Sequence, residues 1–464
     1  MYKIGNHHFS KNIFLLLMAE SILLFFSVLA GAKVRFFSSS PYEHDYSEFL
    51  ATAVVFTCAM IFSMSASGVF QNQLQRRLRY VLLRLGQAYI LGFCIITAVF
   101  YVVPALQIGR GILGLMFFFS AAGLLVTRLV FYKSHHSRIF TSHVLIVGVG
   151  ELAKECGDLV QSGTTTTQYD IAGYIPVGAD EVFVPTELIL QKETSLYETA
   201  RARDATDIVV AVQNKRGGGF PIKELLECKM HGLRVTDSAV FFEREKNQIR
   251  VNSLRPSWLI FGGGFDQTFS RAFMKRTFDL IASVALAILT LPVMGITVLL
   301  IYLEDRGPIF YSQERVGLGG EVYTVFKFRS MGNNAEQAGK PQWAQTNDPR
   351  VTRVGAFIRK TRIDELPQIF NVIMGDMSFV GPRPERPFFV DELNKKVPFY
   401  NLRHSIKPGI TGMAQVRYPY GATVEDAVQK LQYDLYYVKN NSLFLDLLIM
   451  IDTIDVVLHR KGAR

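Results

Sequence analysis

The sequence has few cysteines, and their positions exclude two classes of protein. Only four occur in 464 residues, and none stands at a metal-binding spacing from another. We therefore expect neither a cysteine-based metal centre nor a disulfide framework, but four buried thiols in a reducing compartment. The four cysteines are Cys58, Cys94, Cys156 and Cys228.

Nucleic-acid-binding motifs are also missing, which limits the partners that the net positive charge can indicate. The net charge is +10. Such an excess suits anionic lipid headgroups, phosphorylated substrates or nucleic acid. Because no nucleic-acid module appears, we expect membrane lipid and phosphorylated substrates as partners, and no nucleic acid. Hydrophobic residues make up 49% of the chain and the mean hydropathy is +0.20, which favours a membrane protein.

Residues 1–138 predict a membrane domain of four helices. The first apolar segment also resembles a signal peptide, because Leu29-Ala-Gly-Ala is a weak cleavage site. Its full spanning length and the flanking Lys3 and Lys11 favour a membrane helix instead. The four predicted spans are Ile13–Gly31, Phe49–Phe70, Val81–Val103 and Ile112–Tyr132.

Ionisable residues are scarce inside these spans, which argues against a transporter. Only Glu20, Arg84 and Arg128 occur there. Basic residues gather in the loop at 76–79 and after the fourth span at 133–138. By the positive-inside rule, both ends of this block are expected in the cytoplasm.

Residues 139–262 predict an α/β domain with a Rossmann-like scaffold. A strand at 143–147 runs into Gly148-Val-Gly150-Glu-Leu-Ala153, a loose form of the dinucleotide-binding fingerprint. No acidic residue follows the second strand at 174–176, where a ribose ligand is expected, and Glu151 stands inside the loop. We therefore expect a scaffold without redox chemistry, with a membrane oxidoreductase as the alternative. The further expected strands are 171–175, 208–212 and 233–236.

An apolar stretch at 277–303 opens the last predicted domain, residues 271–464. It is long enough to span a membrane, but Pro292 stands at its middle and basic residues flank both ends. A spanning helix would export one basic flank, against the charge bias, and Pro292 removes a backbone donor. We therefore expect a broken, re-entrant helix that enters and leaves by the same face. A kinked fifth span is the alternative.

Residues 357–385 place two adjacent carboxylates between a basic run and a Gly-Pro-Arg-Pro loop. Asp364 and Glu365 precede an apolar pattern of helical spacing that ends at Gly375. Asp364 is expected to cap this helix, with Pro367 in its first turn. Taken alone, the stretch is equally consistent with a solvated helix start.

Three further elements complete the last domain. The alternation at 323–331 predicts a half-buried strand that carries Lys327 and Arg329. A glycine-punctuated loop at 402–416 runs into another strand. The apolar segment 443–458 contains three aspartates at wide helical spacing, which predicts an amphipathic, interfacial helix.

Several motifs follow one another in this domain. They are Lys275-Arg-x-Phe-Asp279, Lys327-Phe-Arg-Ser-Met331, Asp364-Glu-Leu-Pro-Gln-x-x-Asn371, Gly375-Asp-Met-Ser-x-Val-Gly-Pro-Arg-Pro384 and Lys407-Pro-Gly-Ile-Thr-Gly412. Together they resemble the bacterial sugar transferase family, the monotopic phosphoglycosyl transferases. The N-terminal half resembles the long members of that family. The resemblance implies a membrane α-helical bundle, an α/β Rossmann-like domain, and an α/β monotopic catalytic domain with a re-entrant membrane helix.

The resemblance also implies a reaction. Members transfer a sugar 1-phosphate from a UDP-sugar to undecaprenyl phosphate and release UMP. This is the first membrane step of exopolysaccharide, O-antigen or capsule biosynthesis, with the catalytic domain on the cytoplasmic face of the bacterial inner membrane. Long members suggest a homodimer. A membrane-anchored scaffold with an inactive catalytic half is the alternative, and the intact Asp-Glu pair argues against it.

Site roles follow from the same resemblance. Asp364 is expected to be the nucleophile, since a carboxylate that attacks phosphorus gives an acyl phosphate. Glu365 joins it in holding Mg²⁺, which screens the charge of two anionic substrates. Arg359 and Arg383 match phosphate-contacting positions, where a planar guanidinium grips oxygens in pairs. The weaker candidates are Lys327 and Arg329 for charge at the membrane face, and Thr411 and Gln415 for the nucleotide side.

Overall fold

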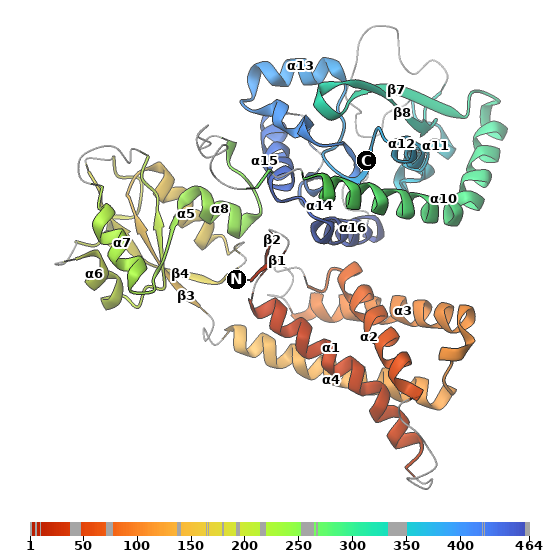
Figure 1. Cartoon of the computed structure of the whole chain (residues 1–464), viewed down its shortest axis with the longest axis horizontal. Helices are drawn as coiled ribbons and strands as arrows, with labels where there is room; N and C mark the ends of the chain where they lie inside the picture. Colours follow the sequence, from red (N-terminus) through yellow and green to blue (C-terminus); the bar gives the residue numbers. More distant parts are fainter. Residues whose placement is uncertain are drawn as a thin grey trace. The chain divides into compact units, whose positions relative to one another are not determined.

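The computed structural model divides into two compact units, and each is described separately (Figure 1). One consists of Met1–Lys3 and His8–Asn247, the other of Ile4–His7 and Gln248–Arg464. This division does not test the three predicted domain boundaries, which stay a prediction. The structure describes residues 2–4, 7–9, 11–37, 48–70, 78–136, 141–163, 165, 167–178, 181–191, 195–213, 220–251, 264–265, 268–332, 350–419, 421 and 423–459.

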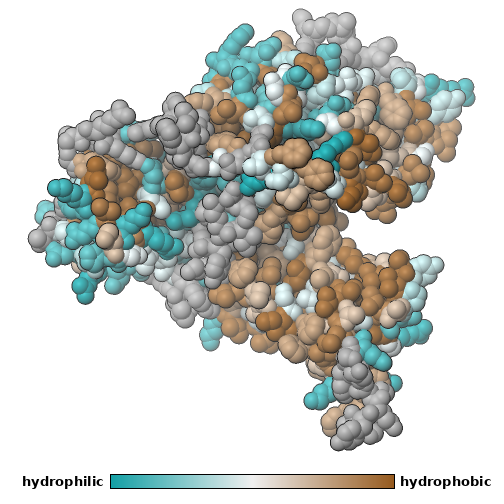
Figure 2. Space-filling view, viewed as in Figure 1, coloured by the Kyte–Doolittle hydropathy of each residue, from teal (hydrophilic) through white to brown (hydrophobic). Residues whose placement is uncertain are grey.

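The first unit has a long apolar helix at each of the four predicted spans. All four are long and apolar enough to cross a membrane. Helix α1 packs against α2 and α4, and hydrophobic side chains cover much of their outer surface (Figure 2). The charged loops at 38–47 and 71–77 lie outside the described residues. The elements are β1 (Tyr2–Ile4), β2 (His7–Phe9), α1 (Lys11–Arg35), α2 (Glu48–Ala66), α3 (Leu78–Val102), η1 (Pro104–Leu106) and α4 (Arg110–His136).

Two of the ionisable residues inside these helices form a buried pair. Arg128 Nη2 of α4 donates to Glu20 Oε2 of α1 at 2.8 Å, and both side chains are buried. The Arg128 guanidinium also lies 5.0 Å from the centroid of the Phe70 ring. Since an unpaired buried charge is costly, the pairing gives these residues a structural role between α1 and α4.

The cysteine prediction is half right. All four thiols are free, and Cys156 and Cys228 are buried. Cys58 and Cys94, however, are exposed on α2 and α3. A membrane helix turns apolar side chains outward as well as inward, so burial did not follow from hydrophobicity there.

The rest of the first unit is a parallel sheet with helices on both faces. The strand order is β4-β3-β5-β6. Helices α5 and α8 cover the face that carries Val144 and Ile146, and α6 and α7 cover the face that carries Leu145 and Val147 (Figure 1). The predicted strands match within a few residues. The elements are β3 (Ser142–Val147), α5 (Glu151–Gln161), β4 (Tyr169–Ile175), η2 (Thr186–Leu188), α6 (Leu196–Ala202), β5 (Asp207–Val210), α7 (Ile222–Met230), β6 (Arg234–Asp237) and α8 (Ser238–Lys246).

The glycine loop after β3 has a structural explanation. Gly148 has φ +125°, and a Cβ there would collide with the carbonyl oxygen of Ala211. Only glycine fits both constraints. The Phe183 N–H donates to the Val149 carbonyl at 2.9 Å, so a later segment of the chain already binds this loop.

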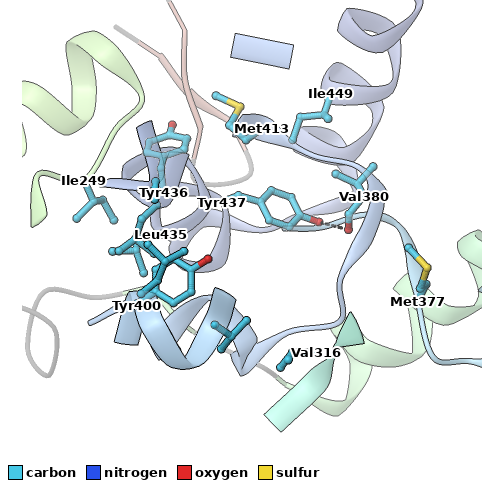
Figure 3. Close-up of a cluster of buried hydrophobic side chains, with 14 of the residues drawn as sticks. Ile249, Val316, Met377, Val380, Tyr400, Met413, Leu435, Tyr436, Tyr437 and Ile449 are labelled. Atoms are coloured by element: carbon cyan, nitrogen blue, oxygen red, sulfur yellow. Dashed lines mark hydrogen bonds between the residues drawn. The ribbon is translucent and has the colours of Figure 1, made fainter. Parts of the chain in front are cut away.

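The second unit combines short strands with helices around two clusters of buried hydrophobic side chains. Strands β7 and β8 pair antiparallel, and β9 and β10 pair parallel. Figure 3 shows Tyr437 reaching across the core to donate to the Val380 carbonyl, at 2.9 Å. The elements are α10 (Phe269–Asp305), β7 (Phe310–Val316), η4 (Leu318–Gly320), β8 (Val322–Phe328), α11 (Arg353–Lys360), η5 (Ile363–Glu365), α12 (Gln368–Met374), β9 (Ser378–Val380), α13 (Pro387–Lys396), η6 (Tyr400–Ser405), β10 (Gly409–Thr411), α14 (Met413–Arg417), α15 (Val424–Asn440) and α16 (Leu443–Leu458).

Helix α10 changes direction along its length but stays helical through Pro292 (Figure 1). Near its start, Arg276 donates to the carbonyls of Val372 and Ile373. Near its end, Glu304 accepts from the Val354 N–H at 3.1 Å. Both ends therefore bind the same unit, while the middle exposes a run of apolar side chains. These include Ile288, Leu289 and Leu291.

Helix α16 is amphipathic, but its polar side faces the protein. Asp446 and Asp455 are buried, and Lys275 Nζ donates to Asp446 Oδ2 at 2.7 Å. The exposed positions include Leu447 and Leu458. The predicted amphipathic pattern is therefore present, with apolar side chains exposed, and the predicted interfacial location stays a prediction.

Candidate active site

The two adjacent carboxylates lie on η5, between α11 and α12. The Thr352 hydroxyl caps α11 by accepting from the Gly355 N–H at 2.9 Å. Arg362 then takes a left-handed conformation, with φ 61°, and turns the chain into η5. Helix α12 begins after Pro367 and makes no side-chain cap hydrogen bond, so the prediction that Asp364 caps it is wrong. Its end at Gly375, with φ 104°, is as predicted.

Glu365 is surrounded by cations. Its Oε1 accepts from Lys327 Nζ at 3.1 Å and from Arg383 Nη2 at 2.8 Å. Arg362 Nη1 lies 4.0 Å from Oε2. Burial opposes the charge on Glu365, but Lys327, Arg383 and Arg362 outweigh it and hold the pKa well below its usual range. Glu365 is therefore a firmly ionised carboxylate.

Asp364 has the opposite environment. Burial, followed by the neighbouring charge of Glu365, raises the pKa of Asp364 to about 6, against the opposing charges of Lys327, Arg362 and Arg359. Its buried Oδ1 has no hydrogen-bond partner among the described residues. A buried carboxylate oxygen without a partner is costly to keep, which makes Asp364 a candidate contact for a ligand or reacting group.

Asn371 fixes the strand that carries Lys327. The fully buried Asn371 side chain accepts from the Phe326 N–H at 3.1 Å and donates to the Thr324 carbonyl at 2.7 Å. It therefore pairs with β8 as a neighbouring strand would and anchors α12 to that strand. Burial lowers the pKa of Lys327, while Glu365 opposes the shift. Asn371 belongs to the Asp364–Asn371 motif, but its residue type and position alone predicted no role for it.

Arg383 joins the Gly-Pro-Arg-Pro loop to the carboxylates. Its Nη1 donates to Gln415 Oε1 at 2.7 Å, while its Nη2 donates to Glu365 Oε1. The loop is tightly packed, since a Cβ on Gly381 would collide with the Lys407 carbonyl. Gln415 is thus brought to the site, but the Thr411 hydroxyl lies 2.7 Å from that of Thr453 and is engaged there.

Two other predicted residues have separate positions. Arg359 is half-buried at the end of α11, and its charge acts on Asp364. Arg329 forms an ion pair with Asp305, at the end of α10. This ion pair links the residue after β8 to the end of α10.

The carboxylates suit a magnesium ion more than a soft metal. Among the described residues, no cluster of three or more His, Cys, Asp or Glu side chains is present. Mg²⁺ needs only one or two carboxylates when substrate phosphates and waters complete its shell. The Oδ1 atom of Asp364, which has no hydrogen-bond partner among the described residues, could serve as one such carboxylate ligand.

Comparison with known proteins identifies sugar transferases as relatives of this chain. The family described as Bacterial sugar transferase matches residues 270–460. The UDP-galactose-lipid carrier transferase of Erwinia amylovora is 32% identical over 363 residues, 71% of each chain. The undecaprenyl-phosphate galactose phosphotransferase of Salmonella typhimurium is 40% identical over 357 residues, 70% of each chain.

A third relative matches over a shorter length. The UDP-N-acetylgalactosamine-undecaprenyl-phosphate N-acetylgalactosaminephosphotransferase of Aeromonas hydrophila is 51% identical over 193 residues. That match covers 42% of this chain and 45% of the relative. The two longer matches extend beyond the catalytic motifs into the first unit, because each exceeds 350 residues. The chain therefore belongs to the bacterial sugar transferase family.

Proposed function

We propose that this enzyme transfers a sugar 1-phosphate from a UDP-sugar to undecaprenyl phosphate and releases UMP. The observation that carries the proposal is the contrast between Glu365, held ionised by Lys327 and Arg383, and Asp364, whose buried Oδ1 is unpartnered. The names of the relatives supply the substrate classes, UDP-linked sugars and undecaprenyl phosphate.

The reaction proceeds in two displacements at one phosphorus atom. An Asp364 oxygen attacks the phosphorus that carries the sugar, the bond from that phosphorus to the UMP oxygen breaks, and UMP leaves. An oxygen of undecaprenyl phosphate then attacks the same phosphorus. The Asp364 carboxylate is released, and the lipid carries a diphosphate-linked sugar.

The surrounding residues control charge during both displacements. Arg383, Lys327 and Arg359 place positive charge near Asp364, where negative charge develops on phosphorus. Arg383 divides its two terminal nitrogens between Glu365 and Gln415, which fixes the plane of its guanidinium. Mg²⁺, when held by Asp364 and Glu365, would polarise phosphoryl oxygens and neutralise substrate charge.

The lipid substrate requires this site to lie at a membrane. We infer that α10 is re-entrant, because both of its ends bind the second unit and its apolar middle is exposed. The cytoplasmic face of the inner membrane then follows from the basic flanks. The α/β part of the first unit acts as a Rossmann-like scaffold without hydride transfer, supported by the loop contact at Val149.

A direct assay tests the proposal. The purified full chain in detergent, with undecaprenyl phosphate and Mg²⁺, is given a panel of UDP-sugars and UMP release is measured. We expect release with at least one UDP-sugar and none from the Asp364→Asn variant. If no UDP-sugar gives UMP, or if the variant keeps full activity, the proposal fails.

A further inference from the structure

The loop that presents Arg383 is held from inside by a second arginine. Arg403, on η6, donates from Nη2 to the main-chain carbonyl of Arg383 at 2.8 Å. Only 5% of Arg403 is exposed, so no substrate reaches it. Arg315 of β7 holds the next carbonyl, that of Pro384, at 3.1 Å. The backbone on which the Arg383 side chain stands is therefore fixed at two consecutive carbonyls.

Arg403 is itself fixed by buried groups. Its Nη2 lies 2.8 Å from Asp434 Oδ2 of α15, and its Nη1 donates to the Tyr400 hydroxyl at 2.5 Å. The guanidinium also lies 5.1 Å from the centroid of the Tyr400 ring. Since Asp434 is only 1% exposed, removing either charge alone would leave the other buried and unpaired. The pair forms a rigid link from α15 to the active-site loop.

We propose that Arg403, anchored by Asp434, is a positioning residue that sets the direction of the Arg383 side chain. Arg383 is one-third exposed and has a flexible stem, so its aim toward Glu365 and Gln415 depends on where its backbone is held. Holding the carbonyl reduces the freedom of that side chain before substrate arrives. This inference rests on the proposed function.

A purely structural role for the pair predicts a different outcome, and a double-mutant cycle separates the two. Arg403→Met with Asp434→Leu removes the pair without leaving a buried charge. This change is made in the natural background and in an Arg383→Ala background, using the full chain in detergent. Because Arg403 acts through Arg383, we expect kcat/KM to fall about 10- to 100-fold in the first background. In the second, we expect less than about a twofold change.

Controls keep the result decisive. Lys396→Gln removes an exposed pair with Glu392 on α13 and should change nothing. Thermal melting is measured for every variant. If the pair-removal variant melts early, Arg403→Lys replaces it in the cycle, since lysine keeps a charge for Asp434 but loses the fixed fork of nitrogens.

The outcomes distinguish the two proposals. An equal loss in both backgrounds, or no loss in the natural background, overturns the positioning role while leaving the proposed function intact. A wild-type chain that releases no UMP from any UDP-sugar overturns both.

Discussion

Asp364 and Glu365 are neighbours in sequence but differ sharply in environment. Glu365 receives hydrogen bonds from two cationic side chains, whereas one oxygen of Asp364 is buried without a partner. Burial raises the pKa of Asp364, and the neighbouring negative charge of Glu365 raises it further. Glu365 is therefore held as an anion, which leaves Asp364 as the candidate for the reacting group.

This separation predicts the pH dependence of the reaction. Asp364 must be deprotonated to attack phosphorus, and burial raises its pKa to about 6. We expect kcat/KM to rise about tenfold per pH unit below pH 6 and to level off above it. Initial rates of UMP release between pH 5 and 8, at saturating Mg²⁺, measure this. A flat profile between pH 5 and 7 would show that Asp364 is not the titrating group.

The same contrast predicts opposite effects on stability. A carboxyl whose folded pKa is raised is stabilised below its unfolded pKa and loses that contribution as pH rises through the folded value. The shift from 3.8 to about 6 corresponds to about 3 kcal/mol at most. Asp364→Asn should therefore raise the melting temperature at pH 8 in the absence of metal, and the gain should vanish near pH 3.5.

Glu365→Gln is the matched control. The lowered pKa of the native Glu365 carboxyl contributes stability above its unfolded pKa. The glutamine variant loses that contribution and leaves Lys327 and Arg383 without their carboxylate partner, so it should melt at a lower temperature at pH 8. An Asp364→Asn chain that melts earlier than the natural chain at pH 8 would contradict the assigned environment.

The sequence predicted the charged motif residues but not how they are supported. Glu365, Lys327, Arg383 and Gln415 meet in the structure. The role of Asn371 and the support of Arg383 by Arg403 were not predicted, because these contacts join residues 20 or more positions apart. The cap assigned to Asp364 failed because the left-handed turn before η5 has no sequence signature here.

At the scale of elements, the proposed function depends most on the path of α10. Both ends bind the second unit, although the helix continues through Pro292. The sequence showed that this segment is long enough to span a membrane but has basic residues at both ends, which a spanning helix would not have. It could not show that the helix continues through Pro292, because that depends on packing along the helix.

A labelling experiment tests the re-entrant path. Single cysteines placed at Arg271 and Arg306, in a chain whose four native cysteines are replaced by alanine, are exposed to an impermeant thiol reagent in inverted vesicles and in intact spheroplasts. We expect both sites to react in inverted vesicles only, because the proposed re-entrant path would keep both flanks in the cytoplasm. Labelling of one site from the outside would show a true span.

Helix α16 shows the limit of reading amphipathicity alone. The apolar and acidic positions were correctly seen, but the sequence does not say which side faces the protein. Lys275 supplies the buried partner of Asp446, and it comes from α10, which lies 171 residues earlier in the chain. Only tertiary structure reveals that pairing.

At the scale of the whole molecule, the candidate site belongs to the second unit. Asp364, Glu365, Lys327, Arg383 and Gln415 all lie between residues 248 and 464. A relative from Bacillus subtilis matches over 131 residues, which is 72% of its length. That relative therefore has roughly 180 residues (131/0.72), too few for a first unit of this size.

We therefore predict that residues 248–464, which keep the buried Ile249 and Val251, retain the transferase activity. The expected kcat/KM is within about tenfold of the full chain, with a modest loss because His7 hydrogen-bonds to Tyr436 at 2.8 Å in the second unit. UMP release in detergent measures it. A fragment that is soluble in detergent and melts cooperatively, yet is inactive, would show that the first unit takes part in catalysis.

The sequence largely predicted the fold class of the molecule, because hydropathy and the spacing of strands are local properties of the chain. The four apolar helices and the parallel sheet lie where the sequence predicted them. The domain boundaries were not settled, since they depend on long-range contacts, such as the grouping of residues 4–7 with the second unit.

The most direct test of the central claim is the isolation of a covalent adduct on Asp364. The full chain is incubated with a UDP-sugar and no lipid acceptor, quenched in acid, digested and analysed by mass spectrometry. We predict that the peptide containing Asp364 gains the mass of the phosphosugar, that the adduct is lost on adding undecaprenyl phosphate, and that Asp364→Asn shows none. No adduct, together with intersecting rather than parallel lines when both substrates are varied, would contradict the account and leave Asp364 as a metal ligand only.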